Sequence, residues 1–447
     1  MSSLLFIALS RRYLSPLLVL CSLLALGLPA CGPGAAPEPA RGSDSPATVR
    51  DPAPTETVPE TPARARGLWV LAEGSQRVLE DPSRLAPLLA TAETLGASDL
   101  FVQVYRGGRS WYASDLADAT PYREQLERSG VDTLARLITE AHARGLRVHA
   151  WVNVLSLSSR RSPPILERLG PQAVLVDRAG RSILDYPNLE VPPPDGDWYR
   201  MGTRGVYLDA GFPGVAEELA ATFAELLTRY PDLDGLHLDY VRYPGVLPFI
   251  PGSRFGVGLD FGYGAETRQR FKDETALTGP YRDPAQPESS AIINSNAWDA
   301  WRRDKVSGVV AAIAHRARAV RPGVVLSAAV ISYVDRAYLS LFQDWPRWLE
   351  DGLIDLAIPM VYTLDERLLR YQLEHFGRGL QRDRIWSGLG VWLFARSPER
   401  ARAQVEIARS SGLVGEVLFS YDAIAESPEL EASLAQALAG DEVSAAP

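Results

Sequence analysis

Hydrophobic and polar positions along the chain follow two patterns that alternate with each other. Short apolar runs typical of buried strands lie at 66–72, 99–106, 147–154, 234–242, 324–331, 354–362, 384–392 and 416–422. Stretches with helical periodicity lie between them, among them 131–144, 214–230, 297–320 and 398–411. Several of these stretches end in a glycine of the kind that closes helices, as at Gly145.

This alternation predicts an α/β fold with a parallel sheet, and eight such strands close into one (β/α)8 TIM barrel. An open doubly wound sheet would need a glycine-rich phosphate loop after an early strand, and the sequence has none. We therefore expect a single barrel domain over 65–440, closed by a charged helix at 426–438 and followed by a disordered tail at 441–447.

Two connections in this predicted barrel are long, after the third strand at 155–213 and after the fourth at 243–296. The second contains many glycines, prolines and aromatic residues and a short helical piece at 265–275. Loops that follow the carboxyl ends of barrel strands build the functional site, so we expect the site there.

The stretch Asp234–Pro244 reads as a buried strand that ends in reactive groups. Side chains alternate along a strand, so Leu236, Leu238 and Tyr240 are expected to face the helices, and His237 and Asp239 the barrel interior. A carboxylate inside a strand is costly unless it is paired or used in chemistry. Asp239 is therefore the leading catalytic candidate.

Polar and aromatic residues at other strand ends should converge around Asp239. Aromatic rings stack on sugar faces, while amides and guanidinium groups bind hydroxyls, so this mixture suits a carbohydrate. Tyr105 is expected on the same face of the second strand as Gln103, and His149 on the same face of the third strand as Trp151 and Asn153. The predicted substrate-binding residues are Gln103, Arg106, Trp151, Asn153, His237, Arg242, Tyr362, Trp392 and Tyr421.

Composition removes several other functions. The net charge of −9 gives no reason to expect binding to nucleic acid or to anionic lipid. The five histidines form no pair with helical metal-ligand spacing, so neither a metal site nor a cofactor is predicted. No Gly-x-Ser-x-Gly motif is present. Carboxylate acid/base or nucleophilic chemistry remains, which is the chemistry of glycoside hydrolysis.

The first 30 residues read as an export signal. Arg11 and Arg12 precede an apolar run that fits a signal-peptide core better than a membrane span. The run ends in Leu-Pro-Ala-Cys31, which looks like a bacterial lipobox whose cysteine becomes the lipidated first residue. We expect a lipoprotein signal peptide at 1–30 and a disordered Pro/Ala-rich tether at 31–64. Gly32 carries no acidic retention mark, which favours the outer membrane, facing the periplasm.

The chain resembles the glycosyl hydrolase-like 10 family of bacterial envelope proteins. The resemblance rests on the motifs Arg66–Val70, Phe101–Val104, Trp111–Ser114, His149–Asn153, Tyr207–Gly211, Asp234–Pro244, Trp301–Asp304, Gln343–Trp345, Pro359–Tyr362 and Phe419–Asp422. It implies a glycosidase-type barrel with Asp239 at the central acidic position of strand four. Some members have a second Asp directly after it, where this chain has Tyr240.

The second catalytic group is accordingly open between several candidates. Asp344 comes first for its place in the Gln-Asp-Trp motif, and Asp422 and Asp209 follow. An N-acetyl group on the substrate could also act as nucleophile, so that one enzymic acid suffices. For Asp239 itself, Arg242 would lower the pKa and suit a nucleophile, whereas burial would raise it and suit an acid.

The sequence thus predicts a lipid-anchored envelope glycoside hydrolase, with peptidoglycan glycan strands as the favoured polysaccharide. A non-catalytic glycan-binding lipoprotein on the same barrel is the alternative, because a fold does not imply an activity.

Overall fold

The computed structural model describes residues 64–248, 259–282, 292–379 and 381–439. The predicted signal peptide, tether and carboxyl-terminal tail lie outside these residues, apart from the tether's last residue, Arg64.

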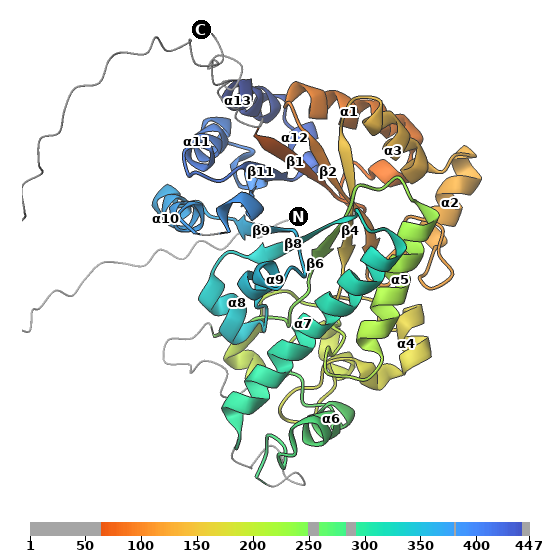
Figure 1. The fold of residues 1–447 in the computed structure, drawn as a ribbon, viewed down its shortest axis with the longest axis vertical. Coiled ribbons are helices and arrows are strands. Elements are labelled where there is room, and N and C mark those ends of the chain that lie inside the picture. The colour runs from red at the N-terminus through yellow and green to blue at the C-terminus, as the bar shows by residue number, and fades with distance from the viewer. Residues whose placement is uncertain (1–63, 249–258, 283–291, 380, 440–447) are drawn as a thin grey trace, which may run out of the picture. The chain divides into compact units, whose positions relative to one another are not determined.

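Eight parallel strands form a closed barrel (Figure 1). Each strand pairs with its neighbours in parallel, and β1 closes the ring because it pairs with both β2 and β11. The predicted (β/α)8 barrel is confirmed. The strands are β1 (Ala65–Val70), β2 (Asp99–Arg106), β4 (Arg147–Asn153), β6 (Gly235–Asp239), β8 (Val325–Ile331), β9 (Leu356–Val361), β10 (Ser387–Leu389) and β11 (Gly415–Phe419).

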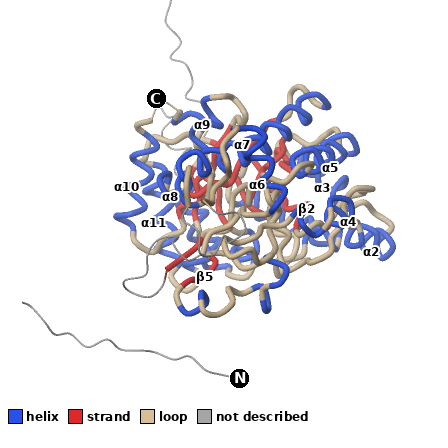
Figure 2. Tube along the Cα trace, turned by 90° about the horizontal axis from the view of Figure 1, so that it is seen from below, coloured by secondary structure: helices blue, strands red, loops and turns tan. Residues whose placement is uncertain are grey.

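Helices surround the strands, as the tube view of Figure 2 shows. The α-helices are α1 (Leu85–Thr94), α2 (Thr120–Ser129), α3 (Thr133–His142), α4 (Pro164–Leu169), α5 (Val215–Arg229), α6 (Ala265–Thr275) and α7 (Ser295–Val320). They continue with α8 (Val334–Ser340), α9 (Trp345–Glu350), α10 (Glu366–Gly377), α11 (Pro398–Arg409), α12 (Tyr421–Ala425) and α13 (Pro428–Leu438). Among the described residues, no helix combines the length and apolarity that crossing a membrane requires.

Helix α3 shows how local sequence produces these elements. The Asp132 carboxylate accepts a hydrogen bond from the Ala135 N–H at 3.0 Å, which satisfies a free donor of the first turn. Leu134, Leu137 and Ile138 recur at helical spacing and are buried against the sheet. Gly145, at φ 74°, takes the left-handed conformation beyond the helix end, which glycine adopts at least cost.

Side chains of alternate residues along the strands fill two separate cores. Leu236 and Leu238 belong to the larger one, between the strands and the helices, which we call the helix-side core. The smaller one fills the barrel interior and is built around large rings such as Trp69, Phe101 and Trp151. The polar residues of β6 lie on this interior side, so the predicted alternation holds through Asp239.

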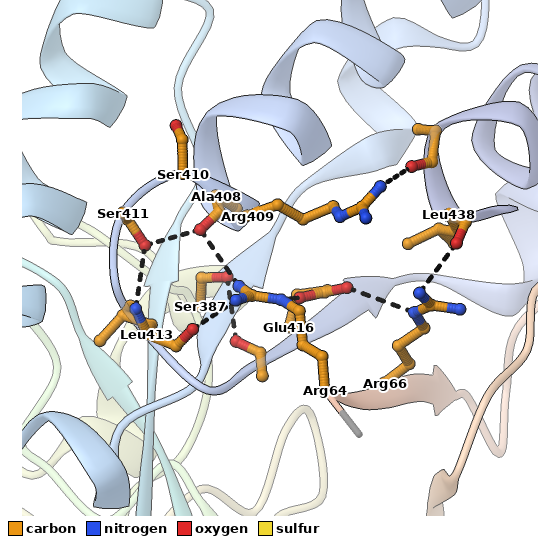
Figure 3. A network of polar contacts seen from close by, with 12 residues as sticks. Arg64, Arg66, Ser387, Ala408, Arg409, Ser410, Ser411, Leu413, Glu416 and Leu438 are labelled. Atoms are coloured by element: carbon orange, nitrogen blue, oxygen red, sulfur yellow. Dashed lines mark hydrogen bonds and ion pairs between the residues drawn. The ribbon is translucent and has the colours of Figure 1, made fainter. Parts of the chain in front are cut away.

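At the amino-terminal ends of the strands, which we call the base, a buried carboxylate holds the first strand in place (Figure 3). Glu416 of β11 is fully buried and pairs with Arg64 and, at 3.6 Å, with Arg66. Arg66 also donates to the Leu438 carbonyl at 2.8 Å. The contacts tie the start of β1 to β11 and to the end of α13.

The two long connections pack together at the opposite end. The connection after β4 contains β5 (Tyr199–Met201), and the connection after β6 contains β7 (Val246–Pro248). These strands form a separate two-stranded antiparallel sheet. Asp209 also joins the two connections, since it accepts hydrogen bonds from the Tyr243 hydroxyl at 3.1 Å and from the Thr267 hydroxyl at 2.8 Å.

Candidate active site

A cavity of about 740 Å³ opens at the carboxyl-terminal ends of the strands. Its floor and walls come from several strands and from the connection after β4. The strand residues that line it are Trp69, Gln103, Arg106, Trp151, Asn153, Asp239, Ala329, Met360 and Phe419. The size lies within the usual range for ligand sites, roughly 300–1,000 Å³.

Asp239 is the last residue of β6 and lines this cavity with only 4% of its surface exposed. Its Oδ1 accepts hydrogen bonds from the Tyr240 backbone N–H at 2.6 Å and from Arg242 Nη1 at 3.2 Å. Burial raises the pKa of the Asp239 carboxyl, and the positive charge of Arg242 partly opposes that rise. The balance favours the protonated acid more than in a solvent-exposed aspartate.

Tyr240 departs from the predicted strand pattern. It packs against the helix-side core, as expected, but β6 ends at Asp239 and Tyr240 has φ 52°. This left-handed turn lets Tyr240 line the cavity, with the Arg242 guanidinium 4.4 Å from the centre of its ring. A left-handed conformation is uncommon for a bulky residue and is concentrated at functional sites.

Two amides form one wall of the cavity. Gln103 Nε2 donates to Asn153 Oδ1 at 3.2 Å, and Gln103 Oε1 accepts from the Ala72 backbone N–H at 3.4 Å. These bonds orient both amides, and an oriented amide binds a sugar hydroxyl at less entropic cost.

Aromatic rings supply the remaining predicted contacts. Trp151 and Tyr362 line the cavity, and Phe419 stacks on Tyr362 with ring centres 5.5 Å apart. Trp69 lies beside Phe419 at 6.0 Å. The structure thus brings Gln103, Arg106, Trp151, Asn153, Asp239, Arg242 and Tyr362 to one cavity, as the sequence predicts.

His237 lies one layer deeper than predicted and does not line the cavity. Its Nε2 accepts from the Trp69 indole N–H at 3.0 Å, so Nδ1 carries the proton and donates to the Ser327 hydroxyl at 2.8 Å. Burial lowers the pKa of His237 well below its usual value. The imidazole is therefore neutral and supports Trp69 from below.

Three other predicted site residues lie away from the cavity lining. Asp344 is half-buried at the start of α9, next to Gln343, which bonds the Ile331 N–H. Trp392 follows the short β10 and is 47% exposed. Tyr421 begins α12 and packs in the helix-side core. Trp392 and Tyr421 lie outside the cavity because β10 and β11 end before them, whereas the sequence predicts that each residue continues its strand.

The alternative acidic partners and two other expected residues serve structural contacts. Asp422 Oδ1 accepts from the Gln76 N–H at 2.9 Å, and Asp209 joins the long connections. A register shift between Gln103 and Tyr105 turns Tyr105 into the helix-side core. His149 lies deep in the barrel and contacts Asp99 at 2.8 Å.

Some cavity residues were not predicted from the sequence. Trp69, Arg161 and Arg204 line the cavity together with Asn188 and Leu189. Trp69 lies in the Arg66–Val70 motif, so the sequence carried a signal for it. The other four residues lie in the connection after β4, whose sequence shows no helical or strand periodicity.

Charge in the cavity is mainly positive. Four arginines line it, Arg106, Arg161, Arg204 and Arg242, while Asp239 is the one carboxylate among the described lining residues. Arg106 also pairs with Glu73 at 3.3 Å. Guanidinium groups are multiple hydrogen-bond donors, well suited to sugar hydroxyls and acidic substituents. In the described part of the chain, no three acidic, histidine or cysteine side chains come together as metal ligands.

A barrel with a carboxylate, amides and aromatic rings at the carboxyl-terminal ends of its strands is an arrangement that suits a glycosidase. The family model for glycosyl hydrolase-like 10 matches residues 64–374, and the chain belongs to that family. It is 23% identical over 380 residues to "Glycosyl hydrolase DigH" of Escherichia coli K12, covering 77% of this chain and 74% of the relative. It is also 23% identical over 302 residues to "Glycosyl hydrolase YngK" of Bacillus subtilis, covering 64% and 50%.

Solved structures share the fold. The catalytic domain of a beta-amylase from Paenibacillus polymyxa superposes with a TM-score of 0.53 at 14% identity, over 86% of this chain and all of that one. A beta-galactosidase from the psychrophilic Marinomonas ef1 gives 0.50 at 13% identity, over 85% and 60%. Family and fold together make this protein a glycoside hydrolase with a carbohydrate substrate.

Proposed function

We propose that this hydrolase cleaves the glycan strands of peptidoglycan in the bacterial envelope and that Asp239 is its acid catalyst. The observation that carries the proposal is the position of Asp239. It is a buried carboxyl with a raised pKa at the end of β6, inside a cavity lined by amides, rings and arginines.

A proton donor in glycoside hydrolysis must hold its proton near neutral pH and release it as the bond breaks. Burial supports the first requirement, because it raises the pKa of Asp239. Arg242 supports the second, because its hydrogen bond to Oδ1 stabilises the carboxylate left behind. Asp239 would protonate the leaving oxygen and regain a proton when water enters.

The attacking group is the second part of the proposal. Asp239 is the one carboxylate among the described cavity residues, which favours a nucleophile supplied by the substrate. The amino sugars of peptidoglycan carry an acetamido group whose oxygen can attack the neighbouring anomeric carbon, as in other substrate-assisted glycosidases. Tyr362 and Asn153 line the cavity and offer hydrogen bonds to hold that group.

Location is proposed from the amino-terminal sequence. The lipobox ending in Cys31 would anchor the protein in the outer membrane, facing the periplasm and within reach of the glycan. Cys31 lies outside the described residues.

The test is Asp239→Asn. This substitution keeps the shape and size of the side chain, but asparagine has no carboxyl proton to donate. Turnover of purified peptidoglycan, measured as new reducing ends, should fall by roughly 10²–10⁴-fold while circular dichroism is unchanged. Asp344→Asn is the matched control, since Asp344 lies outside the cavity, and it should retain full activity.

Two results would separate the alternatives. Full activity in folded Asp239→Asn would remove Asp239 from the reaction. Tight binding of glycan strands by the unaltered protein without any release of reducing ends would favour the non-catalytic glycan-binding lipoprotein.

A further inference from the structure

A second cavity, of about 480 Å³, lies within the connection after β4. It shares Asn188, Leu189 and Arg204 with the first cavity, so the two meet along a common wall. We propose that they form one groove and that the second cavity is a distal subsite for further sugar units of the same glycan chain. The substrate would then be a polymer bound along the groove and cut internally. This inference rests on the proposed function.

The connection that forms the second cavity is held from within by a buried carboxylate. Asp177 is fully buried and accepts from Arg181 Nε at 2.6 Å and from the Tyr186 hydroxyl at 2.7 Å. At its other end, β5 pairs with β7 of the next connection. A wall fastened at both ends gives a subsite a fixed shape, which lowers the entropic cost of binding.

The shared wall also carries unusual backbone geometry. Asn188 has φ 51° and Leu189 has φ 57°, so two consecutive residues without glycine adopt the left-handed conformation. Asparagine tolerates this region, whereas leucine rarely does. Such strain persists where the surrounding structure enforces it, typically at ligand-binding segments. Here it shapes the stretch where the two cavities join.

The lining of the second cavity has the mixed chemistry that sugars need. Arg204 pairs with Glu190 at 2.9 Å, and both side chains are largely exposed, so they can exchange this contact for hydroxyl groups. Arg200 and Met201 line the second cavity but not the first. Arg200, whose Nη1 donates to the Gly196 and Tyr199 carbonyls, brings a positive charge to this cavity, and Met201, half-buried against the helix-side core, an apolar surface for a ring face.

The experiment compares long and short fragments prepared from the same purified peptidoglycan glycan strands. The measured quantity is the ratio of kcat/KM for long strands to kcat/KM for fragments too short to reach both cavities. Met201→Trp should fill the second cavity, and Arg200→Ala should remove its cation. Arg200→Ala should lower the ratio by about tenfold, as expected for one lost charge-assisted contact. Met201→Trp should lower it by a similar factor because the larger ring blocks the subsite. Arg367→Ala, on an exposed part of α10, is the matched control and should leave the ratio unchanged.

A ratio that stays at the value of the unaltered enzyme in folded Arg200→Ala and Met201→Trp would overturn the subsite. If Met201→Trp fails to fold, the Arg200→Ala measurement decides alone. An unaltered enzyme that cuts no glycan strand of any length would instead refute the proposed function. An unaltered enzyme that releases only terminal sugars would refute internal cleavage along the groove.

Discussion

Two residues of one strand, His237 and Asp239, illustrate how depth in the barrel determines chemistry. Both point to the interior, but His237 is covered by Trp69 and bonded to Ser327, so its hydrogen-bonding capacity is used. Asp239, one layer nearer the opening, reaches the cavity. Both are buried, and burial favours the neutral form of each, lowering the pKa of the imidazole and raising that of the carboxyl.

The charge of Arg242 gives a test of which role Asp239 performs. Arg242 favours the carboxylate and so lowers the pKa of Asp239, and Arg242→Gln should raise that pKa further. An acid acts in its protonated form, so activity should persist to higher pH and the alkaline limb of the kcat/KM profile should move upward. A shift of the acidic limb instead would identify a nucleophile that acts deprotonated. The unaltered enzyme measured in the same buffers is the reference.

Trp151 combines a structural and a binding role. It is 4% exposed, contacts His237 and Phe419 edge to face, and also lines the cavity. Because Trp151 is a predicted substrate-binding residue that lines the cavity, Trp151→Ala should weaken glycan binding. Its burial adds a loss of about 3–5 kcal/mol in the free energy of unfolding. Urea unfolding and glycan binding by the folded fraction measure the two effects separately. Unchanged binding would leave Trp151 a core residue alone.

At the scale of elements, the sequence predicts what depends on local periodicity. Each of the eight predicted runs overlaps a barrel strand, and 265–275 coincides with α6. The errors fall where tertiary contacts override the pattern. The register shift at Tyr105 reverses the direction of its side chain, and the left-handed turn at Tyr240 brings a residue that packs on the helix-side core to the cavity as well; neither has a local signal. The pairing of β5 with β7 joins segments far apart in sequence.

The ion pairs between Glu416 of β11 and Arg64 and Arg66 at the start of β1 should contribute to the stability of the protein and not to its catalysis. Burial raises the pKa of Glu416, while Arg64 and Arg66 oppose the rise and hold the group as an ion pair. Glu416→Gln would leave two guanidinium groups short of their counter-charge. The free energy of unfolding should drop by about 3–5 kcal/mol, as for other broken buried pairs.

Urea denaturation measures this change, with exposed Glu429→Gln on α13 as the control, expected within about 0.5 kcal/mol of the unaltered protein. The folded fraction of Glu416→Gln should keep its kcat/KM, because the base lies at the opposite end of the barrel from the cavity. A lower kcat/KM in the folded fraction of Glu416→Gln than in the unaltered protein would contradict this separation.

The two ends of the barrel have different roles: the base stabilises the fold, and the opposite end carries the candidate active site. The base contains ion pairs such as Glu416 with Arg64 that tie β1 to β11, and the opposite end contains Asp239 and the cavity that it lines. The number of strands was enough to predict closure, because eight parallel strands form a barrel. It could not predict which residues meet in the cavity, since much of the cavity wall comes from the connection after β4, whose course is set by distant contacts.

Attachment of this barrel to a membrane is the prediction that concerns the whole chain. Two cysteines are present, Cys21 within the apolar run of the predicted signal peptide and Cys31 at the end of the predicted lipobox. If Cys31 is lipidated, Cys31→Ala should move the protein from the detergent-extracted membrane fraction to the soluble periplasmic fraction. Cys21→Ala removes the other thiol and should leave the membrane fraction unchanged. Acyl chains add about 0.8 kcal/mol of membrane binding per buried methylene, so their loss should be visible as nearly complete release. A Cys31→Ala protein that stays with the membrane would show that another segment anchors it.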